Sequence, residues 1–288
     1  MILIAISGST KCDWQLIDSA GKATAFSSTG INPFFHSEEE IIDVFNSIKE
    51  IAAVKDSIEI VYIYSAGCGS KRLKTVVRNA LGQVFTRSHF YVNHDIVASA
   101  LSTYEGVPAI SCILGTGSNA CFFDGDIVRQ EIPALDYILS DEGGGSYYGK
   151  KLLTAYLHNT MPQELREKFS SQYALSQEEI LEKVYMQPYA NVYLASFMPF
   201  IQDNIKDEYL YTMVKEGMGL FMDLFVRSFS RFNNVKTHFT GSIAYYFKDI
   251  LNEVASAKKI TVGKIIKEPI NDLVKYHLDK SPPQGSSQ

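Results

Sequence analysis

The sequence lacks a cluster of basic residues, a long hydrophobic run and any sign of a leader segment. Its 288 residues carry 27 Lys and Arg against 32 Asp and Glu, for a net charge of −5, and the basic patch that nucleic-acid binding needs is not visible. No apolar stretch approaches the roughly 18 residues of a membrane span. The apolar start, residues 1–6, is too short for a signal peptide and has no basic residue. We therefore expect a cytoplasmic protein without nucleic-acid or membrane partners.

Two further motifs are missing. The four cysteines, Cys12, Cys68, Cys112 and Cys121, form no Cys-x-x-Cys pair, which argues against a zinc or redox motif. The phosphate-binding pattern Gly-x-x-x-x-Gly-Lys-Ser/Thr is also absent. What is present is a chain with 46% hydrophobic and 20% charged residues. That composition is typical of a globular protein, and the length suggests about two domains.

Short apolar runs alternate with turns of small residues. Residues 2–6 and 13–17 flank such a turn and predict a β-hairpin. Further strands are predicted over 23–28, 58–64 and 89–92, and helices over 38–54, 71–81 and 95–104. The pattern begins again with strands at 109–114 and 120–124, a long helical part to about residue 233, strands at 238–240 and 260–262, and a last helix over 268–278. Two halves with the same beginning indicate an internal duplication.

Three loops of small residues follow predicted strands. Ser7-Gly8-Ser9-Thr10-Lys11 offers backbone N–H groups, hydroxyls and an ammonium to an anion, although a polar hairpin turn explains it equally well. Gly115-Thr116-Gly117-Ser118-Asn119 repeats this arrangement in the second half. Gly241-Ser242-Ile243-Ala244 starts a helix, whose N-terminus favours phosphate and whose glycine admits a flat ring, but it is no stronger than a helix cap.

Two acidic segments complete the set of candidates. Asp95, in Asn93-His94-Asp95, stands where a strand ends and a helix begins. It is either the helix N-cap or a general base for a sugar hydroxyl. The second segment, Ser140-Asp141-Glu142-Gly143-Gly144-Gly145, is either a loop that contacts a ligand or a flexible acidic loop.

These five segments, in this order, resemble the N-acetylglucosamine kinase and BadF/BadG/BcrA/BcrD ATPase family of the actin, Hsp70 and hexokinase superfamily. The resemblance extends over residues 1–278. It implies an α/β fold of two ribonuclease-H-like (actin-like ATPase) domains with a nucleotide cleft between them. The expected N-terminal domain is 1–108 together with a returning C-terminal helix, 265–280. The expected C-terminal domain is 109–264, and residues 281–288 are expected to form a disordered tail.

The resemblance also assigns roles. It implies ATP and Mg²⁺ as cofactors and a small sugar as the partner, with N-acetylglucosamine or a related hexosamine as the acceptor, and it is compatible with a homodimer. Asp95 matches the catalytic base and also contacts the sugar, together with Asn32, Asp141 and Gly143. The residues implied in ATP binding are Ser7, Gly8, Ser9, Thr10, Lys11, Gly115, Thr116, Gly117, Ser118, Gly241, Ser242 and Ala244.

One position departs from the family pattern. The first loop of the family usually opens with an aspartate that helps to hold Mg²⁺, and Ile6 occupies that position here. Isoleucine cannot ligate or orient water, so phosphoryl transfer should be slower. The first hypothesis is a sugar kinase. The second is a weak or inactive protein of the same fold that binds a nucleotide or amino sugar. The third, and least favoured by the scattered cysteines, is an ATP-hydrolysing activator with an iron–sulfur cluster.

Overall fold

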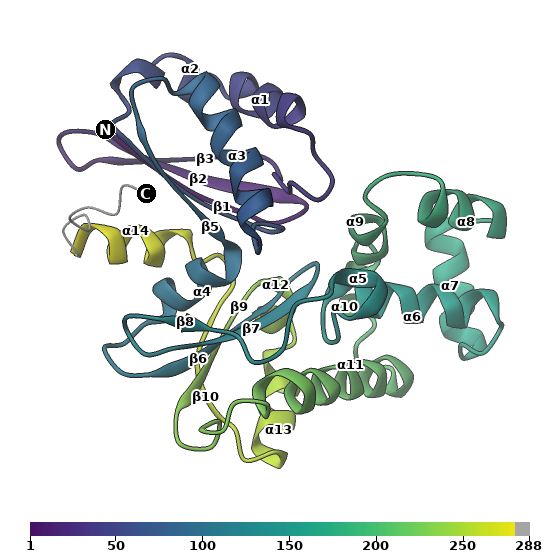
Figure 1. Cartoon of the computed structure of the whole chain (residues 1–288). Coiled ribbons are helices and arrows are strands. Elements are labelled where there is room, and N and C mark those ends of the chain that lie inside the picture. The colour runs from purple at the N-terminus through teal and green to yellow at the C-terminus, as the bar shows by residue number, and fades with distance from the viewer. Residues whose placement is uncertain (280–288) are drawn as a thin grey trace. The chain divides into compact units, whose positions relative to one another are not determined.

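A mixed five-stranded sheet forms the centre of each of two units in the computed structural model, which describes residues 1–279 (Figure 1). Within the described residues, unit 1 consists of Met1–Tyr104 and 268–279, and unit 2 is Glu105–Lys267. The predicted disordered tail, 281–288, lies outside the described residues.

The sheet of unit 1 contains β1 (Ile2–Ser7), β2 (Lys11–Ile17), β3 (Ala23–Thr29), β4 (Ile60–Ser65) and β5 (His89–His94) in the order β3-β2-β1-β4-β5. The predicted hairpin is confirmed, because β1 and β2 pair antiparallel, whereas β4 pairs parallel with both β1 and β5. Parallel strands end at one edge of a sheet, so the carboxyl ends of these three lie together. Ser7 pairs with Ser65, and Ser65 pairs with His94.

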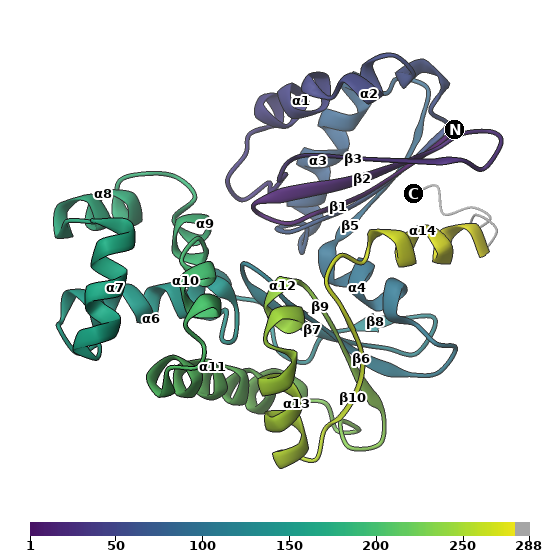
Figure 2. The ribbon, with the colours of Figure 1, turned by 180° about the vertical axis from the view of Figure 1, so that it is seen from behind.

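Helices cover both faces of this sheet, which explains why β1 is apolar at nearly every position. On one face, Leu3 and Ala5 pack with α1 (Glu38–Ser47) and α3 (Lys71–Val84). On the other, Ile4 packs with α4 (Asp95–Thr103) and α14 (Ile270–Asp279). Figure 2 shows α14 beside α4 from behind, and the two helices are in contact. The last helix therefore returns to unit 1.

Two predicted helices have different bounds in the structure. The single helix predicted over 38–54 is wrong, because Ile48 adopts an extended conformation that ends α1 and separates it from α2 (Lys49–Ala52). A short 3₁₀ turn, Lys55–Ser57, follows. The returning helix expected over 265–280 begins only at Ile270, because Ile265 and Ile266 still pair with a neighbouring strand.

Unit 2 repeats the strand topology of unit 1. Its strands are β6 (Ala109–Leu114), β7 (Ser118–Phe123), β8 (Val128–Arg129), β9 (Lys236–Thr240) and β10 (Thr261–Ile266), in the order β10-β9-β6-β7-β8. As in unit 1, the first three strands form an antiparallel meander and the last two pair parallel. The shared order confirms at the level of structure that the second half repeats the first.

The long helical part predicted for unit 2 lies between β8 and β9. It consists of α5 (Asp136–Leu139), α6 (Gly145–Leu157), α7 (Gln163–Tyr173), α8 (Gln177–Tyr185), α9 (Ala190–Ala195), α10 (Met198–Asp203), α11 (Glu208–Phe221) and a π-helical turn, Met222–Val226. Two further helices, α12 (Ser242–Tyr246) and α13 (Lys248–Ala257), separate β9 from β10. Across residues 1–279, no helix combines the length and the apolar character needed to cross a membrane.

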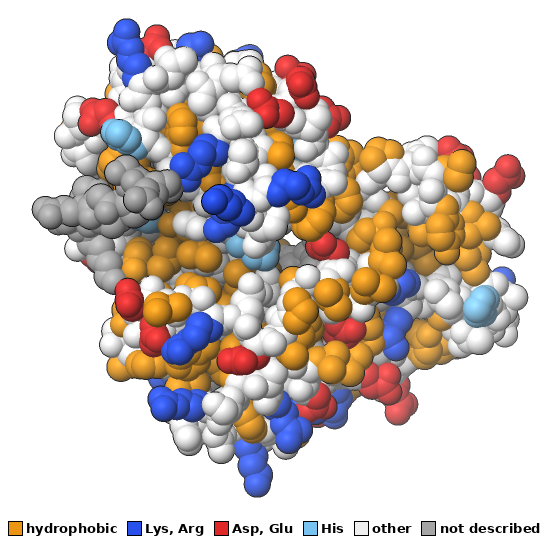
Figure 3. Space-filling view, viewed as in Figure 1, with side chains coloured by type: hydrophobic (Ala, Val, Ile, Leu, Met, Phe, Trp, Pro, Cys, Tyr) orange, Lys and Arg blue, Asp and Glu red, His pale blue; other side chains and the backbone are white. Residues whose placement is uncertain are grey.

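Hydrophobic side chains are exposed on part of this helical region. In Figure 3 they gather over the segment that contains α5 and α8. Ile138 and Leu139 of α5 are 70% and 73% exposed, and Tyr185 at the end of α8 is 76% exposed. Apolar patches of this kind are typical of surfaces that contact another molecule.

Candidate active-site loops in the two units

Four segments of unit 1 meet at the carboxyl edge of its sheet. They are the first loop after β1, the segment Gly30-Ile31-Asn32, the turn Ser65–Gly69 after β4, and the junction of β5 with α4. Buried Ser7 links the first two, because its hydroxyl accepts a hydrogen bond from the Ile31 N–H at 2.6 Å and donates to the Ile31 carbonyl at 3.0 Å. The Ser65 hydroxyl donates to the same carbonyl. The Ser7 side chain therefore ties the first loop to the segment Gly30-Ile31-Asn32.

The first loop exposes the groups that an anion would contact. Thr10 and Lys11 are exposed, whereas Gly8 and Ser9 are half-buried. The Lys11 ammonium lies 2.6 Å from the Asp13 carboxylate and 3.6 Å from that of Glu268. The hydrogen bond to Asp13 raises the pKa of Lys11 above its usual value despite partial burial. Lys11 therefore carries a positive charge at neutral pH.

Asn32 is nearly enclosed by its neighbours. It is 3% exposed, its amide donates to the Ser9 hydroxyl at 3.2 Å, and its side-chain oxygen accepts the Phe34 N–H at 3.0 Å. Gly67 approaches it so closely that a Cβ at that position would overlap the Asn32 amide oxygen, and its φ of +78° also favours glycine. The turn after β4, which the sequence did not point to as a site, thus fixes the predicted sugar-binding asparagine.

Asp95 is the first residue of α4 and follows the N-cap residue, His94, so the N-cap interpretation of Asp95 is wrong. Its side chain is 19% exposed. His94 Nε2 lies 3.2 Å from Asp95 Oδ1, yet among the described residues no group donates a well-directed hydrogen bond to this oxygen. Burial raises the pKa of the Asp95 carboxyl above its usual value, while His94 and nearby backbone N–H groups act in the opposite direction. A partly buried carboxylate with a raised pKa is suited to accept a proton.

Three predicted segments of unit 2 also meet at one sheet edge. β6 and β9 are parallel neighbours, with Ile113 opposite Thr240, so the loops that begin at Gly115 and Gly241 leave the sheet side by side. The glycines of the acidic segment complete the cluster, because the Gly145 N–H donates to the Gly115 carbonyl at 2.8 Å and the Ser146 N–H donates to the Thr116 carbonyl at 2.9 Å.

Asp141 is the charged group inside this cluster. It is 8% exposed and adopts a φ of 68°. Its Oδ1 accepts the Ser118 N–H at 2.9 Å, and its Oδ2 accepts the Ser146 hydroxyl at 3.3 Å. A Cβ at Gly117 would lie 2.7 Å from both carboxylate oxygens, so only glycine lets the loop pass this close. Burial raises the pKa of Asp141 to about 6.

The other predicted residues of unit 2 differ in what they expose. The Ser118 hydroxyl is buried and has no hydrogen-bond partner among the described residues, so a water molecule or a polar ligand atom is expected beside it. Gly143 is buried with a φ of 75°. Ser242, at the start of α12, is exposed, whereas Ala244 is fully buried and serves to pack that helix.

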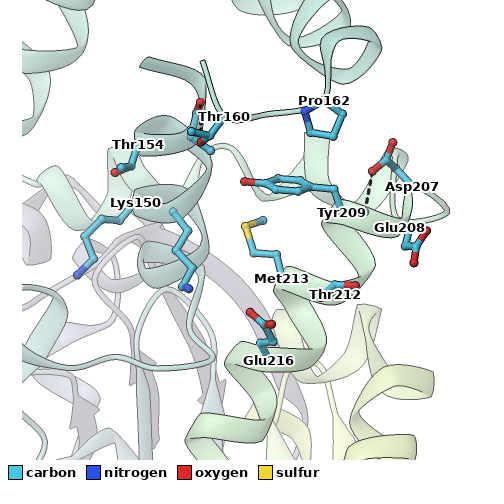
Figure 4. Close-up of a pocket in the computed structure, with 12 residues that line it drawn as sticks. Lys150, Thr154, Thr160, Pro162, Asp207, Glu208, Tyr209, Thr212, Met213 and Glu216 are labelled. Carbon is cyan, nitrogen blue, oxygen red and sulfur yellow. Dashed lines mark hydrogen bonds between the residues drawn. The ribbon is translucent and has the colours of Figure 1, made fainter. Parts of the chain in front are cut away.

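A separate hollow of about 800 Å³ lies between α6 and α11 in unit 2 (Figure 4). Lys150 and Thr154 line it from α6, and Tyr209, Met213 and Glu216 line it from α11. None of the site residues predicted from the sequence belongs to this wall, so the hollow is distinct from the loop clusters.

Neither a protein-family model nor a curated protein sequence matches the chain. Solved structures do. A proposed N-acetylglucosamine kinase from Porphyromonas gingivalis superimposes with a TM-score of 0.90 and 34% identity, covering 97% of this chain and 99% of that one. A proposed N-acetylglucosamine kinase from Chromobacterium violaceum gives a TM-score of 0.71 at 13% identity, covering 96% and 98% of the two chains. A glucokinase of the ROK family from Streptomyces griseus, solved with glucose and AMPPNP, gives 0.54 at 15% identity, covering 97% and 99%.

These matches and the repeated strand order define the fold as that of two-domain, actin-like sugar kinases, which confirms the predicted fold class. The identity to the Porphyromonas protein over nearly both whole chains is more specific. The chain belongs to the N-acetylglucosamine kinase family of the actin-like ATPase superfamily.

Proposed function

We propose that this protein transfers the γ-phosphoryl group of ATP to N-acetylglucosamine or a related hexosamine. The observation that carries the proposal is the 34% identity, over nearly the whole chain, to a proposed kinase of that sugar. The placement of Asp95 supports it, because a half-buried carboxylate with a raised pKa lies at the same sheet edge as the first loop and Asn32.

In the proposed reaction Asp95 acts as the general base. The sugar hydroxyl loses its proton to the Asp95 carboxylate as its oxygen forms a bond to the γ-phosphorus, and the bond from that phosphorus to the β–γ bridging oxygen breaks to release ADP. Little covalent chemistry is required of the protein, so positioning of the reactants dominates. Asp95 Oδ1, which has no well-directed hydrogen bond from the described residues, can take up the proton.

The phosphates of ATP would be held by the small-residue loops. Ser9, Thr10 and Lys11 offer hydroxyls and a positive charge, and the Ser118 hydroxyl, which has no partner within residues 1–279, offers a buried donor. Backbone N–H groups of Gly8, Gly115 and Gly117 would add to these, and the segment 241–244 would receive the adenosine. Asn32, Asp141 and Gly143 remain the proposed sugar ligands, with the internal hydrogen bonds of Asn32 and Asp141 fixing their orientation.

Mg²⁺ is the cofactor that this reaction implies, and it would neutralise phosphate charge during transfer. Among residues 1–279 there is no cluster of three groups able to hold a metal ion, but Mg²⁺ usually takes only one or two carboxylates besides water and phosphate oxygens. Asp13 supplies one such carboxylate. It lies directly opposite Ile6 in the β1–β2 pair, so the two side chains share a face of the sheet. Asp13 would orient water bound to Mg²⁺ in place of the missing aspartate.

The second candidate function is binding of a nucleotide or amino sugar with little or no turnover. Ile6 favours it, because Asp13 is already paired with Lys11 at 2.6 Å and would have to exchange that partner for a water of the metal shell. The iron–sulfur activator has less support, since all four cysteines are buried. Cytoplasmic location and a homodimer remain predictions, and light scattering would test the homodimer.

The test is ADP release from ATP and Mg²⁺ with a panel of hexoses and N-acetylhexosamines. The natural protein would be compared with Ile6→Asp, and Asp95→Asn would serve as the inactive control. Sugar-dependent release by the natural protein is expected. Release only by Ile6→Asp would favour the binding protein. If neither the natural protein nor Ile6→Asp releases ADP, although the sugar still binds in calorimetry, the proposal of a kinase would be overturned.

A further inference from the structure

The titratable side chain of His94 lies in close contact with the Asp95 carboxylate. Its Nε2 lies 3.2 Å from Asp95 Oδ1, and both side chains are largely enclosed, at 16% and 19% exposure. Because Oδ1 has no well-directed hydrogen bond from the described residues, a small rotation of either side chain would complete one. The contact is local, since His94 is the N-cap residue and Asp95 the first residue of α4.

The other groups near Asp95 do not take the place of His94. From α3, Lys74 donates to the side-chain oxygen of Asn93 at 3.0 Å, so its charge is directed to that neighbour. From the turn after β4, Cys68 lies close enough to sense the carboxylate, but burial raises the pKa of its thiol to about 12. The Cys68 thiol therefore stays neutral at neutral and acid pH.

The turn after β4 also lies beside the His94 ring. Gly69 faces this ring, and a Cβ at Gly69 would lie 3.7 Å from Cε1 and 3.8 Å from Nδ1. The same turn holds Asn32 through Gly67. The His94 ring and the proposed sugar-binding Asn32 therefore both lie against the turn after β4.

We propose that His94 is a positioning residue for Asp95, which orients the carboxylate through Oδ1 and makes its strength as a base depend on the charge of the imidazole. The proposal rests on the proposed function. A neutral imidazole with its proton on Nε2 would donate to Oδ1 and fix the carboxylate. A protonated imidazole would stabilise the carboxylate as an anion and so weaken it as a base. The rate would fall on the acid side as the Asp95 carboxylate takes up a proton.

Two substitutions separate these effects. His94→Gln keeps a neutral N–H donor but cannot titrate, whereas His94→Phe keeps a flat ring without any donor. With the glutamine we expect turnover near the natural value at high pH and an acid limb shifted to higher pH. With the phenylalanine we expect kcat to fall about tenfold or more at all pH values, with little change in the sugar KM. The matched control is His89→Gln, an exposed histidine at the start of the same strand, which should leave the profile unchanged.

A second measurement does not need turnover. Carboxyl-carbon NMR of protein labelled at aspartate, with the Asp95 signal assigned from its loss in Asp95→Asn, would follow the titration of Asp95 directly. An opposite charge at this distance lowers the pKa of a carboxyl by about one unit or more, so His94→Gln should raise the apparent pKa of Asp95 by that amount.

The two measurements keep the two proposals apart. If the NMR shift appears but no sugar supports ADP release, the proposed function fails and the pairing stands. If the Asp95 titration is the same in the natural protein, His94→Gln and His89→Gln, the role of His94 is overturned. An unshifted acid limb in an active His94→Gln protein would overturn it as well.

Discussion

Acidification should loosen the attachment of α14 to unit 1, because this helix buries a histidine that is neutral in the folded protein. The His277 ring stacks on Tyr62 with 4.0 Å between ring centres, and a hydrogen bond of 3.0 Å joins its Nε2 to the Tyr64 hydroxyl. Burial lowers the pKa of His277 from 6.5 to about 4. In this unit the helix packs on α4 through Ile270 and Leu273.

The direction and size of the effect follow from the two pKa values. Between pH 6.5 and about 4 the unfolded chain binds the proton and the folded chain does not, so stability falls as the pH falls through this window. One pKa unit corresponds to about 1.4 kcal/mol, which gives a total loss of about 3 kcal/mol at the acid end. Roughly 1 kcal/mol of it should already be lost near pH 5.5.

Denaturant unfolding followed by tryptophan fluorescence would measure this loss. Trp14 is the sole tryptophan of the chain and is buried in unit 1, so its emission reports the unit that holds α14. The natural protein, His277→Phe and His89→Gln would be compared near pH 7.5 and pH 5.5. The phenylalanine variant should be less stable at both pH values, because the Tyr64 hydroxyl loses its partner at a cost of about 1–3 kcal/mol.

What distinguishes the histidine is the dependence on pH. The loss between the two pH values should be smaller by about 1 kcal/mol in His277→Phe than in the natural protein, whereas His89→Gln should behave like the natural protein. An equal loss in all three proteins would refute the reasoning and place the titrating group elsewhere.

The remaining predictions concern the loops. Asp95→Asn should abolish turnover while calorimetry finds sugar affinity nearly unchanged, and turnover equal to that of the natural protein would remove Asp95 as the base. Ile6→Asp should make ATP binding more dependent on Mg²⁺, as titrations with and without the metal would show. Asp141→Asn should stabilise the protein near neutral pH, because the pKa of this carboxyl is raised to about 6 and its ionised form opposes folding. Thermal melts would contradict this if the natural protein gained stability relative to the variant between pH 4 and 6. Gly117→Ala should weaken ATP binding, since its Cβ would press on the Asp141 carboxylate.

Local sequence determined the elements on which the site is built. The apolar runs and the small-residue turn at residues 7–11 were enough to predict the β1–β2 hairpin, and the repeat of this pattern from residue 109 predicted the second sheet. Strand-to-loop changes of this kind depend on a few consecutive residues, so they can be read from sequence. The prediction of one helix over 38–54 was wrong, because the spacing of its apolar residues does not show that Ile48 is extended.

Tertiary structure alone decided which of these segments meet. Asp13 is opposite Ile6 because of the strand register. The Gly67–Gly69 turn reaches both Asn32 and His94 because the strands β1, β4 and β5 end in line. Asp141 faces the loop at Gly117 because α6 begins beside that loop. The turn did carry a signal, since Gly67 and Gly69 come shortly after the end of the apolar strand β4. The sequence shows which residues are of types that can bind phosphate and sugar. Contacts between residues far apart in the chain depend on strand register and side-chain packing, which no local pattern specifies.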